Sequence, residues 1–149
     1  AQVQRIPLIM ATDVGNNIFV DIERYDLDSN LPFFQGRVKG IEKIDFEKLN
    51  LRQRLEIVYS IVGFEEHSLR MLWSLANIGK KVLTWPQLAS TSTISGGLIT
   101  TAITKIILRE TIDTGRYIFS IDGIFSKGVR SEKEEGAKKR LIRKIKSFE

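Results

Sequence analysis

How the stretch from Thr84 to Lys105 folds decides what the rest of this chain can build. It reads TWPQLASTSTISGGLITTAITK, it is rich in Ser and Thr, and it carries no charge before Lys105. The Ile and Thr content of this stretch suits the propensities of a strand better than those of a helix. As a helix, its second half and the residues after it present an apolar stripe: Ile99, Ala102, Ile103, Ile106 and Ile107. This stripe favours a helix over Ile99–Leu108.

The alternation of apolar residues near the N-terminus predicts a β-hairpin. Ile18, Val20 and Ile22 follow the period of two that a half-buried strand requires. The turn falls at Val14–Asn17, where Gly and Asn tolerate the positive φ of a tight hairpin. A second hairpin is predicted to turn at Asp113–Gly115, because apolar residues alternate again after that point.

Three helices are predicted between the two hairpins, besides the one at Ile99–Leu108. Asn50 caps the first, which Gly63 ends. The second places Leu69, Leu72, Trp73 and Ala76 on one face, which assigns Trp73 to the core. The third is short and begins at Thr84, with Pro86 in its first turn, where the missing N–H does no harm.

The net charge of +5 is concentrated at the C-terminal end. From Lys127 onward there are nine Lys or Arg against four Glu, whereas residues 1–126 carry fourteen charges of each sign. We therefore expect one globular domain at 1–126 and a basic tail or helix at 127–149. Leu141, Ile142, Ile145 and Phe148 share one face of that helix.

Several classes of protein are excluded by composition. The chain has no Cys, which rules out disulfides, zinc–thiolate sites and thiol catalysis. No apolar run reaches the ~18 residues of a membrane span, and we expect no signal peptide. We expect a cytoplasmic protein.

The order of predicted elements over residues 66–121 is helix, short helix, turn, helix and β-hairpin. Ala89 supplies a small residue where two helices would cross, and Ile94 would fill the turn five residues later. Ser95 then stands where the second helix needs a cap. This pattern resembles the winged helix-turn-helix superfamily over about 55 of the 149 residues. The segment IDTGRYIFSIDGIFSKG also looks like the same region of winged-helix plasmid replication initiators.

The resemblance implies an α+β fold with an N-terminal β-hairpin, a winged helix-turn-helix body and a basic C-terminal helix. One position departs from the pattern: Thr93 stands where Gly is common, and the glycines are displaced to Gly96 and Gly97. In the family, the second helix of the motif enters the major groove of duplex DNA. The residues that would contact DNA there are Ser95, Thr100, Thr101, Thr104 and Lys105, with Arg116 on the wing. A scaffold for protein contacts is the alternative.

The basic tail is a second candidate for DNA contact. Its cations could neutralise phosphates: Lys138, Lys139, Arg140, Arg143, Lys144 and Lys146. The same pattern fits an anionic membrane surface. In a third alternative, Leu141, Ile145 and Phe148 dock on the core and the cations are merely solvated.

Catalysis has little support in the sequence. His67 is the single histidine and is expected on a helix surface, and no nucleophile–base pair, phosphate loop or metal cluster is recognisable. We therefore expect a non-enzymatic DNA-binding protein for replication, partition or transcription control, with no cofactor and with homodimerisation left open. The alternative is a structural or assembly protein, of a viral matrix-like kind, that uses the tail on an anionic membrane or nucleoprotein.

Overall fold

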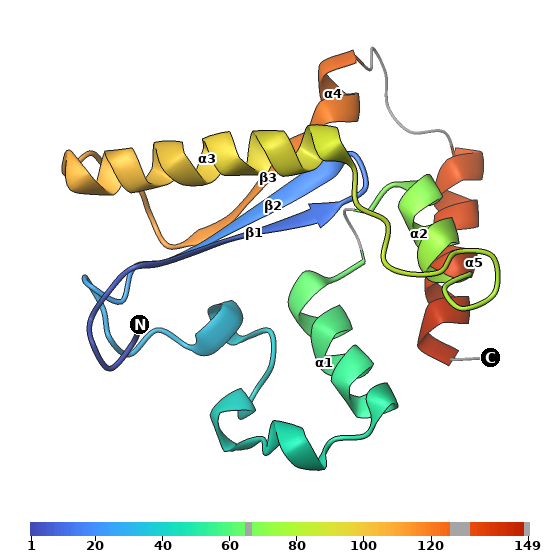
Figure 1. Cartoon of the computed structure of the whole chain (residues 1–149), viewed down its shortest axis with the longest axis horizontal. Helices are drawn as coiled ribbons and strands as arrows, with labels where there is room; N and C mark the ends of the chain where they lie inside the picture. Colours follow the sequence, from blue (N-terminus) through green and yellow to red (C-terminus); the bar gives the residue numbers. More distant parts are fainter. Residues whose placement is uncertain (65–66, 126–131, 148–149) are drawn as a thin grey trace.

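The computed structural model, which describes residues 1–64, 67–125 and 132–147, has an α+β architecture (Figure 1). A three-stranded antiparallel sheet lies at its centre, in the order β1-β2-β3. Its strands are β1 (Leu8–Val14), β2 (Asn17–Glu23) and β3 (Gly115–Ser120). All seven residues of the middle strand β2 are buried, so both faces of the sheet are covered there.

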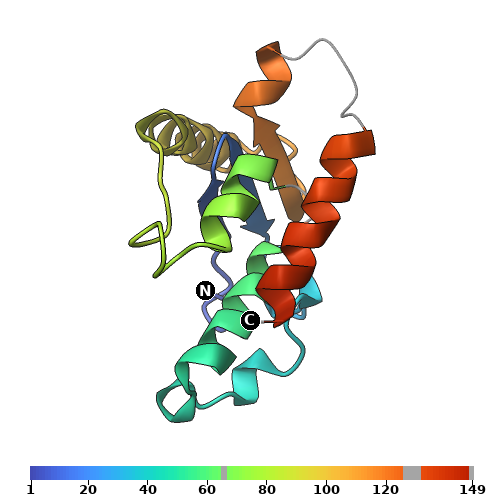
Figure 2. The same ribbon diagram turned by 90° about the vertical axis from the view of Figure 1, so that its right-hand side faces the viewer.

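The helices are divided between the two sides of this sheet (Figure 1). They are α1 (Leu51–Val62), α2 (Leu69–Leu75), α3 (Ala89–Ile107), α4 (Ile121–Phe125) and α5 (Glu132–Ser147). Short 3-10 helices occupy Phe33–Gly36, Ile41–Lys43 and Phe46–Lys48. The long α3 runs along one face, α1 lies on the opposite side, and α2 packs beside α5 at the end of the sheet (Figures 1 and 2). None of the described helices is both long and apolar enough to cross a bilayer.

The N-terminal hairpin confirms the sequence prediction. β1 pairs with β2 from Leu8↔Glu23 to Val14↔Asn17, which leaves Gly15 and Asn16 as the turn. Gly15 has a φ of 76°, and a Cβ there would come within 3.1 Å of Met71 Cβ. Glycine is needed at this point both for the turn and for its close approach to α2.

The helices predicted after Asn50 and around Leu72 are also present. Asn50 caps α1 through a reciprocal pair of hydrogen bonds with Gln53, and Gly63 ends it. Ser68 caps α2 by accepting from the backbone N–H of Met71. The prediction of a core position for Trp73 is wrong, because its side chain turns outward from α2 and is 45% exposed.

The predicted helix-turn-helix is wrong, because one continuous helix runs from Ala89 to Ile107. No helix begins at Thr84, and Ser95 lies within α3 rather than at its start. The hydroxyls that suggested a turn are satisfied inside the helix. Thr93 donates to the carbonyl of Ala89 at 2.8 Å, for example. The Ser and Thr residues thus interrupt neither the backbone nor its hydrogen bonding.

An apolar stripe on α3 explains why this helix continues. Ile94, Leu98 and Ala102 are spaced by four residues and pack on one face of β2, against Ile18 and Val20. The predicted stripe is displaced in part, since Ile103 and Ile107 are 44% and 72% exposed. The helix begins well before Ile99, and the sheet selects the stripe that fits it.

The predicted second hairpin is also wrong. β3 pairs with β2, in the register Phe119↔Ile18 and Tyr117↔Val20, and it is the single strand within residues 67–125. The alternation after Gly115 correctly predicts a strand, but the partner of that strand is distant in sequence. Phe119 extends the apolar face of β2 under α3, and this burial selects the long-range pairing.

The predicted C-terminal helix is present as α5 and belongs to the packed body. Leu141, Ile142 and Ile145 contact the cluster formed by Phe64 and α2. Phe148, Lys127 and the predicted boundary after residue 126 lie outside the described residues.

Candidate functional site

The basic helix α5 is held by one face and free on the other. Ile145 is 6% exposed and joins Phe64, Leu72 and Leu75 in a buried cluster that Leu141 also contacts. α2 and α5 lie side by side in both views, so this cluster fixes the orientation of α5 (Figures 1 and 2). The prediction that apolar residues of the tail dock on the core is confirmed for Leu141 and Ile145.

The outward face of α5 carries five exposed cations: Lys139, Arg140, Arg143, Lys144 and Lys146. At 100° per residue, they cover about 160° of the helix circumference, opposite the buried Ile145. None of the five forms an ion pair within the described ranges of the chain, and Lys146 Nζ lies 5.8 Å from the centroid of the Phe64 ring. All five are among the tail cations predicted to contact phosphate, and they are positioned on one helix.

Lys138 does not belong to this face. It is 6% exposed and lies on the side of α5 that faces a polar cavity. The apolar stripe of α5 turns position 138 inward together with Leu141 and Ile145, away from the five exposed cations, and its contact with phosphate stays a prediction.

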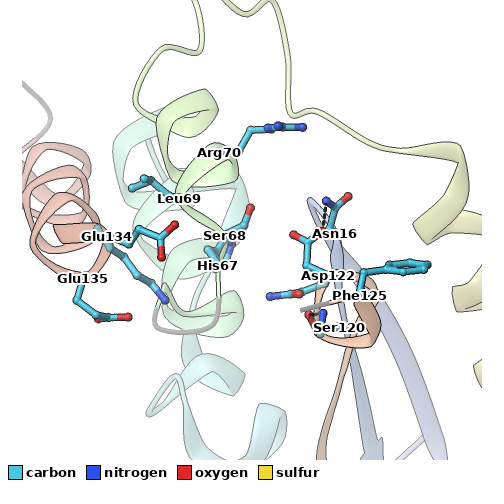
Figure 3. Close-up of a pocket in the computed structure, with 13 residues that line it drawn as sticks. Asn16, His67, Ser68, Leu69, Arg70, Ser120, Asp122, Phe125, Glu134 and Glu135 are labelled. Carbon is cyan, nitrogen blue, oxygen red and sulfur yellow. Dashed lines mark hydrogen bonds between the residues drawn. The ribbon is translucent and has the colours of Figure 1, made fainter. Parts of the chain in front are cut away.

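The polar cavity, of about 640 Å³, lies where the hairpin turn, the start of α2, α4 and the first half of α5 meet (Figure 3). Its lining mixes both charges: Arg70, Asp122, Glu134, Glu135 and Lys138. Asn16 and Asp122 both line the cavity, and Asn16 Nδ2 donates to Asp122 Oδ1 at 2.8 Å. Over residues 1–64, 67–125 and 132–147, no group of three His, Asp or Glu residues could hold a metal ion.

His67 lies against this cavity and is 1% exposed, so the prediction of a helix-surface histidine is wrong. Its ring meets Phe19 edge-on at 5.8 Å between centroids and lies 6.0 Å from Phe64. His67 precedes α2 rather than lying on it, and its ring packs in the interior against Phe19 and Phe64.

The contact residues predicted on α3 are engaged within the protein. Ser95 is buried, and its hydroxyl donates to Asp13 Oδ1 at 2.6 Å. Ser92 donates to the other oxygen of Asp13, also at 2.6 Å. This pair fastens α3 to the end of β1. The predicted role of Ser95 in DNA contact is therefore wrong.

Further along α3, the predicted residues are exposed but satisfied. Thr100, Thr101 and Thr104 each donate to the carbonyl four residues earlier, at 2.7 to 2.9 Å. Lys105 Nζ lies 2.6 Å from Glu110 Oε2 in an exposed ion pair. The outer face of α3 is consequently uncharged from Ala89 to Thr104.

Arg116 is buried in the sheet and cannot act as the predicted wing contact. Its guanidinium pairs with both carboxylate oxygens of Asp21 at 2.7 Å, and the two side chains are 9% and 5% exposed. It also donates to the carbonyls of Ile61 and Val62 at 2.8 Å. A cation at the C-terminus of α1 complements the helix dipole, so the residue joins β2, β3 and α1.

A second buried polar group lies on the same side of the sheet. Glu23 accepts from the Tyr25 hydroxyl at 2.5 Å and from the backbone N–H of Gln35 at 3.1 Å. Burial of the hydroxyl is the main cause that raises the pKa of Tyr25, and the hydrogen bond to Glu23 raises it further. These contacts hold the Phe33–Gly36 segment against the sheet and are structural.

Trp73 is a surface residue that the sequence pattern does not reveal. It lies on the outer side of α2, and Lys81 Nζ is 5.9 Å from the centroid of its ring. Arg70 and Lys80 are also exposed. The sequence does place this aromatic residue near three cations, which is a weak indication of a surface position. The apolar spacing of α2 indicates a core position more strongly, and it led to the wrong prediction.

Comparison with known proteins gives little further information. No family model matches the chain, and no solved structure matches it significantly. An uncharacterized protein of Mycobacterium tuberculosis is 29% identical over 111 residues, which are 74% of this chain. The chain spans about 15% of the length of that relative, so the similarity concerns a small part of a much longer protein.

Proposed function

We propose that this chain is a DNA-binding domain without catalysis of its own, which contacts phosphates through the outward face of α5. The observation that carries the proposal is the set of five exposed cations on that face, with the opposite face anchored to α2. Replication, partition or transcription control in the cytoplasm remains the predicted setting.

The density of charge on α5 is comparable to that of a nucleic acid. From Lys139 to Lys146 the helix rises about 10 Å, at 1.5 Å per residue, which places one cation about every 2 Å. Duplex DNA carries one negative charge per ~1.7 Å of its axis. An anchored helix also loses little conformational entropy on binding, because its backbone is already ordered.

Binding through α5 is expected to be largely independent of sequence. Lysine and arginine contacts to phosphate position a protein on DNA, whereas base-edge contacts specify the site. The threonines of α3 that the sequence pattern assigns to base reading donate their hydroxyls to their own helix, and Lys105 is paired with Glu110. We therefore propose no base reading by α3 and no winged-helix mode of recognition.

The test is fluorescence anisotropy with two duplexes of different sequence at several salt concentrations. Replacing the five α5 cations by Ala should weaken binding to both duplexes at least about tenfold. It should also flatten the dependence of log affinity on log salt, by about 0.9 for each phosphate that the variant no longer neutralises. Alanine favours helix, and the replaced side chains are exposed, so the fold should persist.

Thr100, Thr101 and Lys105 supply the matched control. Their combined replacement by Ala truncates exposed side chains on α3 instead of α5, and it should leave both affinities within about twofold. Unchanged binding in the α5 variant would overturn the proposal. Flotation with anionic liposomes adds a further outcome: if the α5 variant loses vesicle binding while duplex binding is unaffected, the assembly or membrane-surface function takes its place.

A further inference from the structure

We infer that Trp73 is a stacking platform for an unpaired base, which makes single-stranded DNA a preferred ligand of the α2–α5 surface. This inference rests on the proposed DNA-binding function and adds to it the form of nucleic acid that is bound. The α2–α5 surface here means Arg70, Trp73, Lys80 and Lys81 together with the five exposed cations of α5.

The exposure of Trp73 is the first observation. Its neighbours on α2, Leu72 and Leu75, are 0% and 5% exposed, whereas Trp73 is 45% exposed. The other tryptophan, Trp85, is partly buried, packs against the cluster around Phe64 and directs its indole N–H to the carbonyl of Asp13. Trp73 thus offers an accessible aromatic surface outside the buried cluster.

The charges around the ring are the second observation. Lys81 Nζ lies 5.9 Å from the ring centroid, and Arg70 is one helical turn before Trp73 on α2. Lys80 is exposed beside Lys81. Among the described residues, Arg70, Lys80 and Lys81 form no ion pair. A ring flanked by cations matches a strand in which bases and phosphates alternate.

The position of α2 is the third observation. It packs directly against α5 (Figure 2). Trp73 and the exposed cations of α5 therefore belong to neighbouring helices. Proteins that bind single strands without sequence preference combine these two elements, a cationic track and an aromatic ring on which a base stacks. The side chains of α5 supply affinity for any nucleic acid, and Trp73 adds a contact that only an exposed base face can make.

This last point predicts a distinction between single strands and duplex. In a duplex, each base face is covered by its neighbours, and the ring of Trp73 could reach one only after unstacking. In a single strand, base faces are open, and stacking on an aromatic side chain is tolerant of sequence. The structural alternative is that Trp73 merely forms a surface cation–π pair with Lys81.

The experiment measures the affinity of the full chain for an oligothymidine single strand and for a duplex of equal length. Trp73→Ala should weaken single-strand binding about tenfold and duplex binding by less than about twofold. Trp73→Phe should retain most of the affinity, because it keeps an aromatic face. Lys81→Ala breaks the cation–π pair but leaves the ring, and it should reduce both affinities by a similar small factor.

Fluorescence gives a second readout that a structural role would not move. In a Trp85→Phe variant, Trp73 is the single tryptophan, and single-stranded DNA should quench its emission. In a Trp73→Phe variant, Trp85 remains, and the same strand should change the emission little.

Equal losses for single strand and duplex in Trp73→Ala, or no loss for either, would overturn the inference while leaving α5 binding intact. If the unmodified chain binds neither ligand, the proposed function itself fails, and the two failures are thus distinguishable.

Discussion

Arg116 on β3 and Arg143 on α5 carry the same guanidinium group in opposite settings. Arg116 is bound by Asp21 and by two carbonyls at the end of α1, all at 2.7 to 2.8 Å. Arg143 projects from the outward face of α5 and forms no ion pair among the described residues. The first guanidinium is engaged in contacts within the protein, and the second is exposed to a partner.

The difference teaches that net charge alone does not locate a binding surface. Arg116, Lys105 and Lys138 all contribute to the positive charge, yet they are respectively buried, paired and turned toward a cavity. These three side chains face other parts of the protein, whereas the exposed cations of α5 face solvent. The buried cations should therefore affect stability, and the exposed ones should affect binding.

The largest expected effect is the loss of Arg116. In an Arg116→Met variant, the carboxylate of Asp21 stays buried without its partner, which costs about 3–5 kcal/mol of unfolding free energy. Chemical denaturation followed by circular dichroism measures this change. Arg143→Met is the matched control, because the same substitution on the exposed face should change stability by less than ~0.5 kcal/mol.

A double variant sharpens the interpretation of Arg116. Replacing Asp21 by Leu together with Arg116→Met removes both buried charges, and it should recover much of the stability that Arg116→Met alone removes. No recovery would mean that the carbonyls of Ile61 and Val62, rather than Asp21, are the partners that matter.

An intermediate effect is expected at the anchored face of α5. Ile145→Ala removes buried methyl groups from the cluster with Phe64 and Leu72, and it should cost about 2–4 kcal/mol. Thermal unfolding monitored by circular dichroism checks this prediction. Lys144→Ala changes the adjacent residue on the outward face and should be nearly neutral. If Ile145→Ala is also neutral, α5 is not anchored as described.

The smallest expected effect is at the Arg24–Asp26 pair, whose side chains are less buried than Arg116 and less exposed than the cations of α5. Hydrogen bonding to Arg24 lowers the pKa of Asp26 below its ordinary value of 3.8. The stabilisation is therefore present above that value and is lost as the pH falls through the folded-state pKa. Asp26→Asn should reduce the unfolding free energy by less than ~1 kcal/mol at pH 7, since the side chain of Asp26 is 27% exposed.

The pH dependence of this difference is the informative measurement. Denaturation series at pH 7 and near pH 2 should show that parent and Asp26→Asn variant converge at low pH. A difference that persists in acid would mean that the carboxylate charge is not its source.

Local patterns in the sequence determined several elements of this protein. The period of two at Ile18–Ile22 and the Gly15–Asn16 turn specified the first hairpin, because adjacent strands need only local pairing. The Asn50 cap and the Gly63 stop specified α1 in the same way. The charge balance located the cationic helix, and its apolar spacing identified Leu141 and Ile145 as the anchored side.

The tertiary structure alone decided which partner each element meets. The strand after Gly115 was identifiable from its alternation. Its pairing with β2 was not, because the paired residues, such as Phe119 and Ile18, are about 100 positions apart in the sequence. The Ser and Thr residues of α3 were ambiguous because a hydroxyl can cap a helix or bond back to its own turn. The sheet resolved the ambiguity by accepting Ile94, Leu98 and Ala102. Exposure of Trp73 and burial of Arg116, His67 and Lys138 were likewise set by three-dimensional packing, since periodicity indicates a face but not what covers it.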